Sequence, residues 1–157
     1  MKNIIYEFWF IYMSIKVSWL DDKKTIILCT FEDRWTWHEY SDIEKILWDF
    51  VGRMDYRIDV LADWTLSAGF PLGVMDIIHR IGETTHPPRD DIWVINISTS
   101  PLLKILMGAF RRLYPKFATS YHITDTLDEA IRMLEVNRGN PITKSISSFD
   151  PILSTEK

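Results

Sequence analysis

Residues 92–113 read IWVINISTSPLLKILMGAFRRL and predict a strand followed directly by a helix. Residues 92–97 are nearly all apolar, which is typical of a parallel strand buried on both faces. Ser100 can cap the helix, and Pro101 suits its first position because proline has no backbone N–H to leave unpaired. Pro115 ends the helix. This unit predicts an α/β fold built on a parallel sheet.

The segments before this stretch predict a hairpin and a further helix. Residues 15–19 alternate apolar and polar side chains, and residues 25–31 form a β-rich run after a polar turn, so the two segments pair as antiparallel strands. A helix is predicted over residues 37–53. Thr36 and Glu39 fit a capping box at its start.

The remaining elements complete the order ββαβαβαβα. Strands joined through helices must be parallel, with right-handed crossovers. The sequence therefore predicts a mixed sheet of about five strands with about four helices. The further elements are a strand over 57–63, a helix from Pro71 to Ile81 ended by Gly82, a strand over 117–123, and a helix over 127–138 that is capped by Thr126 and Glu129 and ended by Gly139.

Length and composition fit one globular domain. The chain has 157 residues, of which 46% are hydrophobic and 13% aromatic, so a sizeable core can form. We expect residues 1–13 to be an N-terminal extension, which is either a mis-assigned start ahead of Met13, an added edge strand or a membrane-surface anchor. Residues 14–138 form the domain, and the Ser/Thr-rich residues 139–157 form a flexible tail.

Charge and cysteine content exclude several classes of protein. A net charge of −4 argues against a generic nucleic-acid binder. The single cysteine, Cys29, excludes an intramolecular disulfide framework. No apolar run approaches the ~20 residues of a transmembrane helix. We expect a cytoplasmic protein with neither a transmembrane segment nor a nucleic-acid partner.

Several short motifs resemble those of STAS-like proteins, which share the fold of the bacterial anti-sigma factor antagonists. They are the hairpin, Trp35-Thr36-Trp37, Val60-Leu61-Ala62-Asp63 and Arg112-Leu113-Tyr114-Pro115. The chain is most similar to the uncharacterised subgroup labelled STAS-like or CRAL-TRIO-like, over roughly residues 14–137. The resemblance implies a non-enzymatic domain that binds partner proteins and, in some members, nucleotides or other small ligands.

The resemblance also implies a switch segment after the strand over 57–63. In the antagonists, an Asp-x-Ser-like segment ends this strand, and a second Asp-Ser-Ser-x-Gly segment carries the phosphorylated serine. Asp63-Trp64-Thr65 matches the first segment, whereas residues 66–73 lack the Asp-Ser pair of the second. Thr65 or Ser67 would then accept the phosphate. Alternatively, Asp63 and Thr65 only satisfy backbone amides in a strand-to-helix turn. Trp64 is the best aromatic candidate for a ligand site.

Motifs for catalysis, cofactors and metals are absent from the sequence. It contains no G-x-S-x-G, no P-loop and no G-x-G-x-x-G. His79, Glu83 and His86 have metal-like spacing, but a helix end at Gly82 separates them, so we expect no zinc site. Cys29 lies within a strand and is expected to be a buried, inert thiol. We therefore expect no enzymatic activity and no cofactor.

The helix that follows Pro101 is the main candidate for a binding surface. Between residues 92 and 124 there is no acidic residue, whereas Lys104, Arg111, Arg112 and Lys116 are basic. The helix is apolar over two stripes, although one is enough to cover a sheet. We expect the stripe of Leu102, Ile105, Leu106, Ala109, Phe110 and Leu113 to face the sheet, and the stripe of Leu103, Met107 and Tyr114 to be exposed unless another part of the chain covers it.

These observations predict a non-catalytic, STAS-like protein-interaction or regulatory module, of a kind known in bacterial signalling. The alternative is a binder or sensor of a small apolar or anionic ligand such as a lipid. The predicted partner or ligand surface is Leu103, Lys104, Met107, Arg111, Arg112 and Tyr114, and the occupant is a protein partner, a second copy in a homodimer, or a small amphiphile. An internal cavity would favour the ligand, and a filled core with an exposed stripe would favour the partner.

Overall fold

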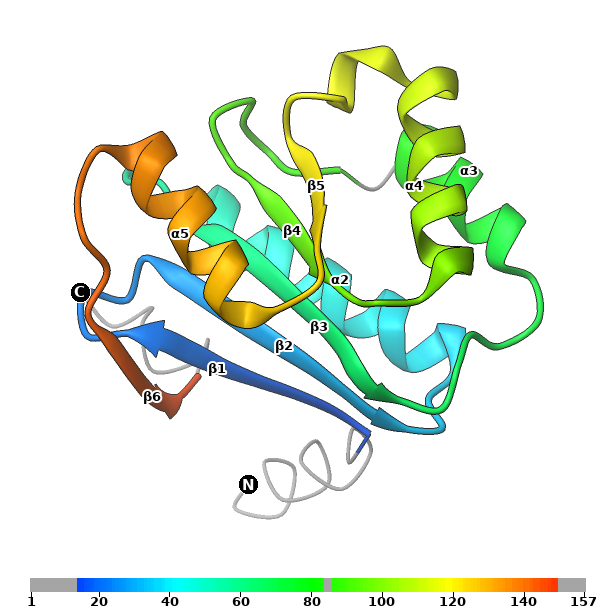
Figure 1. The fold of residues 1–157 in the computed structure, drawn as a ribbon, viewed down its shortest axis with the longest axis horizontal. Coiled ribbons are helices and arrows are strands. Elements are labelled where there is room, and N and C mark those ends of the chain that lie inside the picture. The colour runs from blue at the N-terminus through cyan, green and yellow to red at the C-terminus, as the bar shows by residue number, and fades with distance from the viewer. Residues whose placement is uncertain (1–13, 84–85, 150–157) are drawn as a thin grey trace.

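A computed structural model describes residues 14–83 and 86–149. It confirms the α/β class with a mixed sheet, and the described residues contain six strands and four α-helices (Figure 1). The strands are β1 (Ile15–Asp21), β2 (Ile26–Asp33), β3 (Asp59–Ser67), β4 (Val94–Ile97), β5 (Tyr121–Thr124) and β6 (Lys144–Ser148). The helices are α2 (Trp37–Gly52), α3 (Val74–Glu83), α4 (Pro101–Leu113) and α5 (Leu127–Arg138), with a 3-10 turn, η1 (Pro115–Phe117).

The strands that follow the hairpin extend the sheet at one edge, and the last strand extends it at the other edge. Its strand order is β5-β4-β3-β2-β1-β6. β1 and β2 form the expected antiparallel hairpin, with Ile15 opposite Phe31, and β2 to β5 are parallel. The chain then passes through α5 to the opposite edge of the sheet, where β6 pairs antiparallel with β1.

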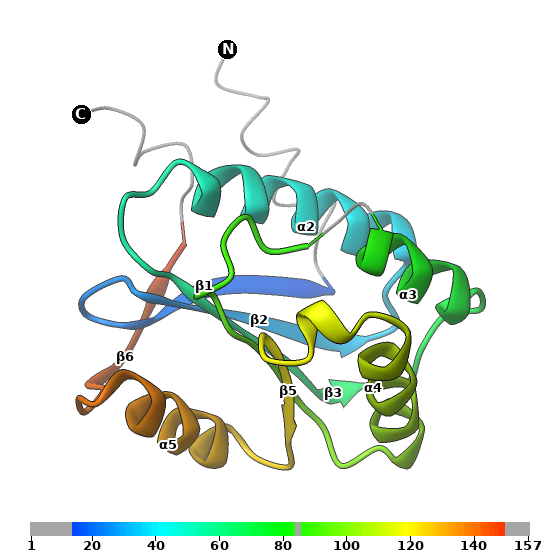
Figure 2. The same ribbon diagram turned by 90° about the horizontal axis from the view of Figure 1, so that it is seen from above.

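Two separate cores cover the two faces of the sheet. The larger core joins the sheet to α2, α3 and α4, and the smaller core joins it to α5. Figure 2 shows α2 and α5 on opposite sides of the sheet. The strands supply both cores because alternate side chains point to opposite faces, as with Val60 and Leu61.

The helix caps follow the sequence signals closely. Thr36 Oγ1 accepts the Glu39 amide, and the Glu39 carboxylate accepts the Thr36 amide, so the predicted capping box is confirmed. Ser100 caps α4, with proline at the first position. At the start of α5 the predicted box is half formed, because Thr126 Oγ1 accepts the Glu129 amide, whereas the Glu129 carboxylate accepts the amide of Asp125 and not that of Thr126. Gly139 ends α5 in the left-handed conformation, with φ 73°.

Several predicted boundaries are wrong. β3 continues to Ser67, α3 begins at Val74 rather than at Pro71, and β5 begins at Tyr121 because Phe117 lies in the 3-10 turn. Gly82 does not end α3. It lies within the helix, where a Cβ atom would overlap the ring of Tyr114.

The tail assigned to residues 139–157 is also corrected, because Lys144–Ser148 forms the edge strand β6. Its residues are mostly exposed, so the sequence has no alternation of apolar residues that would predict the strand. The extension at residues 1–13 and the end of the tail lie outside the described residues.

A buried ion cluster joins α5 to the sheet. Asp59 at the start of β3 is fully buried, and its carboxylate accepts from Arg138 at 2.6 and 2.8 Å and from Arg57 at 3.0 Å. The Trp93 amide donates to the same carboxylate at 2.7 Å. Arg138 also donates to the carbonyl of Thr25 at 2.9 Å. The end of α5 is therefore held by charge-assisted hydrogen bonds.

Candidate functional site

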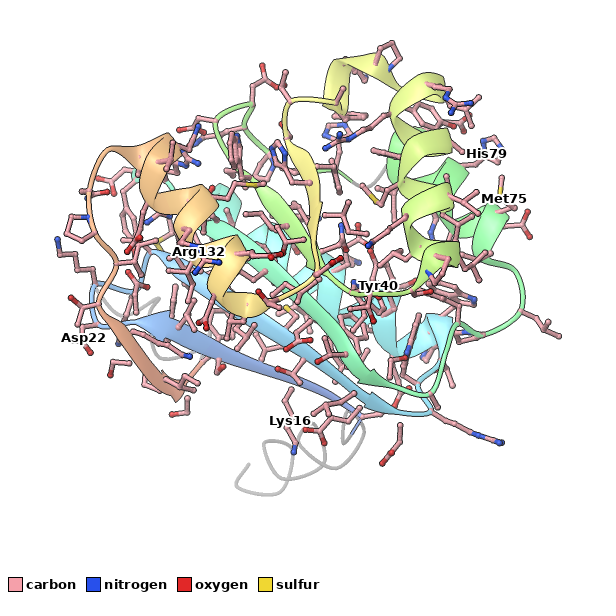
Figure 3. The ribbon with its side chains drawn as sticks, viewed as in Figure 1. Lys16, Asp22, Tyr40, Met75, His79 and Arg132 are labelled. Atoms are coloured by element: carbon pink, nitrogen blue, oxygen red, sulfur yellow. The ribbon has the colours of Figure 1, made fainter. Side chains whose placement is uncertain are left out.

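A cavity of about 120 Å³ lies inside the larger core, between the sheet and α2, α3 and α4. An apolar cavity of similar size, about 150 Å³, is large enough to bind benzene. Figure 3 shows Tyr40, from the cavity wall, in the middle of the molecule, whereas Met75 and His79 of α3 lie at the outer edge. The lining consists of Cys29, Phe31, Trp37, Tyr40, Ile43, Glu44, Leu47, Trp48, Val60, Ala62, Trp64, Phe70, Val74, Ile77, Ile78, Ile81, Val94, Asn96, Leu103, Leu106, Met107, Phe110 and Tyr121.

The cavity arises from a row of short side chains across the sheet. Cys29, Ala62 and Asn96 lie side by side on β2, β3 and β4, and all three point into the larger core. The next row toward the strand ends holds Phe31 and Trp64, whose rings stack at a centroid distance of 3.8 Å. Small residues beside large rings leave a space that the covering helices do not fill.

Hydrogen bonds fix the aromatic wall. Trp64 Nε1 donates to Asn96 Oδ1 at 2.9 Å, and Asn96 Nδ2 donates to the carbonyl of His122 at 3.4 Å. Trp35 packs edge-on against Phe31 at 5.3 Å. Its Nε1 donates to Ser67 Oγ at 2.9 Å. The rings that shape the cavity are therefore held in place without a ligand.

Glu44 brings a carboxyl group to the cavity wall. Burial raises its pKa from 4.5 to about 7, although hydrogen bonding from Trp48 and Tyr40 and the positive charge of Arg80 lower it. Trp48 Nε1 is buried and makes no hydrogen bond of good geometry, so its interaction with Glu44 is weak. The carboxyl group is thus only partly compensated by its surroundings.

The other ionisable groups of the cavity are neutral. Burial raises the pKa of the Cys29 thiol to about 12, so the thiol stays protonated and inert, as expected from the sequence. Burial also raises the pKa of Tyr40 and Tyr121, with the charge of Glu44 adding to both effects. Neither the thiol of Cys29 nor the hydroxyls of Tyr40 and Tyr121 are activated as nucleophiles.

A polar groove of about 330 Å³ adjoins the cavity. It is lined by Ser41, Glu44, Lys45, Trp48, Asp49, Arg80 and His86. Glu44 and Trp48 line both spaces, so they form the wall between the apolar interior and the surface. Arg80 lies on the groove side, where it donates to Ser41 Oγ.

The prediction that Leu103 and Met107 form an exposed stripe is wrong. Both are buried and line the cavity. α4 is rotated relative to the expectation, so Leu102, Ile105 and Leu113 face outward with 50%, 69% and 52% of their surface exposed. The exposed apolar surface of α4 therefore consists of residues that were expected to face the sheet.

Two of the three basic residues of the predicted surface form interactions within the protein. Lys104 pairs with Asp125 at 2.6 Å. Arg111 donates through Nε to the carbonyl of Tyr121 at 3.1 Å, and Arg112 is exposed. Lys104 is thus not an unopposed cation, and the Arg111 side chain is tied to the backbone of β5.

Tyr114 docks α4 on α3. Its ring lies against Gly82, and its hydroxyl lies 2.9 Å from His79 Nδ1. It is half-buried, so it does not continue the predicted stripe. This contact explains why a glycine stands within α3.

The predicted switch segment lies within β3 and not in a strand-to-helix turn. Asp63 Oδ1 accepts the Thr65 amide at 2.9 Å and the Thr65 hydroxyl at 2.6 Å, which is the local structural role that the sequence allowed. Ser67 Oγ donates to the carbonyl of Gly69 at 2.9 Å. Trp64 is buried in the cavity wall, away from these polar groups.

His79, Glu83 and His86, which have metal-like spacing in the sequence, do not form a cluster within the described residues. His79 contacts Tyr114, and the ring of His86 is tilted against that of Phe117, with their centroids 5.0 Å apart. In residues 14–83 and 86–149, no three His, Cys, Asp or Glu side chains are grouped as metal ligands. Over the same ranges, no helix has the length and apolar character to cross a bilayer.

Sequence reasoning missed Glu44, although a signal was present. Tyr40, Glu44 and Trp48 follow each other at intervals of four residues, which places a carboxylate between two aromatic side chains on one helix face. A charged side chain between two aromatic residues on one helix face indicates that the charge itself is buried.

No protein-family model matches this chain, and no curated protein matches it significantly.

Proposed function

We propose that this protein is a non-catalytic binder of a small apolar ligand, which it holds in the cavity under α2, α3 and α4. The observation that carries the proposal is a preformed space of about 120 Å³ lined mainly by aromatic and aliphatic side chains. Small-molecule sites share these features, with a few polar groups to orient the ligand. Glu44 and Asn96 supply such groups.

The chemistry of the cavity favours binding over catalysis. The thiol of Cys29 is protonated, and the hydroxyls of Tyr40 and Tyr121 are neutral. Binding needs only shape and a preformed wall, and the stacked rings of Phe31 and Trp64 provide both. The absence of catalysis and the cytoplasmic location stay predictions.

The test fills the cavity and measures binding of benzyl alcohol. Ala62→Ile places a larger side chain in the middle of the short row on β3, and isoleucine suits a strand. We expect the variant to be more stable than the wild type by ~1 kcal/mol and to lose the binding that tryptophan fluorescence detects in the wild type.

The control is Thr30→Ile, which adds isoleucine next to the same row but on the opposite face of the sheet. It should leave binding intact. The proposal fails if benzyl alcohol does not bind the wild type at millimolar concentration, or if Ala62→Ile binds it equally well.

A second candidate function is the STAS-like interaction module. The outward-facing Leu102, Ile105 and Leu113 on α4 favour it, because they form an apolar strip on a surface helix. The resemblance of the sequence to STAS-like proteins supports a regulatory role for such a surface. Ile105→Lys should abolish self-association in light scattering if the partner is a second copy, and should leave benzyl alcohol binding unchanged.

A further inference from the structure

We propose that the cavity selects a small primary amine with an apolar body, and that Glu44 receives the ammonium group. This inference rests on the proposed ligand-binding function and names the chemical class of the ligand. It follows from the charges and rings that surround the cavity.

The lining is suited to a cation. Eight aromatic side chains contribute to it, and ring faces attract positive charge. Among the described residues of the lining, Glu44 carries the carboxyl group, and there is no lysine, arginine or histidine. An ammonium group would therefore meet a carboxylate and electron-rich rings, whereas a carboxylate ligand would be repelled by both.

The basic residues near the cavity do not reverse this preference. Lys104 pairs with Asp125 outside it, and Arg111 is bonded to the carbonyl of Tyr121. Arg80 approaches Glu44 from the groove, where it also donates to Ser41 Oγ. Glu44 also interacts with Tyr40, Trp48 and Tyr121, which line the cavity and are neutral.

The burial of Glu44 favours the binding of a positively charged group beside its carboxylate. The raised pKa shows that the carboxylate is poorly solvated, and an ammonium group would restore the lost stabilisation. A neutral apolar ligand of the same size would fit the space but would not stabilise the carboxylate. A charge-assisted hydrogen bond is stronger than one between neutral groups, so the amine should bind more tightly.

The experiment compares three probes that share one ring: benzylamine, benzyl alcohol and benzoate. Calorimetry and tryptophan fluorescence measure their affinities for the wild type, for Glu44→Gln and for Asp49→Asn. We expect the wild type to prefer benzylamine over benzyl alcohol by about tenfold and to bind benzoate most weakly. Glu44→Gln should remove the preference, so that the variant binds benzylamine no more tightly than benzyl alcohol.

Asp49→Asn is the matched control, because Asp49 lies on the same helix and lines only the groove. It should keep the preference for the amine. Equal binding of the amine and the alcohol by the wild type, or a preference that survives Glu44→Gln, overturns the assignment of the amine while leaving the ligand-binding function intact. If none of the three probes binds, both proposals are wrong.

Discussion

Replacing Glu44 by glutamine should change how the stability of the ligand-free protein depends on pH. The pKa of Glu44 is raised from 4.5 to about 7, so the folded protein holds a proton that the unfolded chain has released between these values. Stability falls with rising pH wherever the folded state binds more protons than the unfolded state. The contribution of Glu44 is thus fully present below pH 4.5 and is lost as the pH rises through 7.

The size of the effect follows from the same two values. A tenfold change in proton affinity corresponds to about 1.4 kcal/mol, so the change from 4.5 to about 7 is equivalent to roughly 3 kcal/mol. Glutamine keeps the shape and carries no charge at any pH. Glu44→Gln should therefore match the wild type near pH 4 and exceed its free energy of unfolding by up to ~3 kcal/mol at pH 8.

The measurement is urea denaturation of both proteins from pH 4 to 8. His122 acts in the opposite direction, because burial lowers its pKa and stability then rises as the pH increases through its unfolded value. This contribution is the same in both proteins and cancels in their difference. Asp49→Asn, on the exposed side of α2, should show no such growing difference. If the curves of the wild type and Glu44→Gln run parallel from pH 4 to 8, Glu44 is solvated and the argument is refuted.

Three further predictions concern packing and charge, and denaturation measures all of them. Gly82→Ala should destabilise the protein by ~1–3 kcal/mol because its Cβ would overlap the ring of Tyr114. The control Gly108→Ala in α4, where nothing obstructs a Cβ atom, should stabilise the protein by up to ~1 kcal/mol. Equal effects of the two substitutions would contradict the contact between Gly82 and Tyr114. Met107→Asp should unfold the domain because the side chain is buried, and a folded variant would show that α4 can rotate. Arg138→Met should cost ~3 kcal/mol because it removes two hydrogen bonds from the buried carboxylate of Asp59, whereas a loss below ~1 kcal/mol would mean that the remaining arginine compensates.

The order of most elements could be predicted because their signals are local. The capping box at Thr36, the proline at the start of α4 and the glycine after α5 all act within one turn of the backbone. Such signals do not depend on the rest of the fold. β6 was missed because an exposed edge strand needs no apolar alternation, and only its pairing with β1 identifies it.

The orientation of α4 could not be predicted because its apolar residues surround most of its circumference. Leu102, Leu103, Ile105 and Leu106 occupy neighbouring positions, so helical spacing alone allows more than one buried face. The contact between Tyr114 and Gly82 belongs to the rotation that the structure has, and it joins segments far apart in the sequence.

The cavity was beyond prediction for a similar reason. The row of Cys29, Ala62 and Asn96 exists only once the register of three strands is known. The sequence did single out Trp64 as an aromatic candidate, and the structure places it in the cavity wall. It was expected at the end of the strand, beside a loop, whereas β3 continues past it to Ser67.

The pairing of β6 with β1 has a mechanical consequence. Ser18 lies opposite Ser148, and Asp21 lies opposite Lys144, so the start of β1 and the end of β6 point toward the same end of the strand pair. A pulling force applied between these two ends would load the hydrogen bonds one after another, as in opening a zipper, and not all together. β6 buries little surface of its own. Under tension, the domain should therefore release its last strand first, while the parallel strands and both cores remain folded.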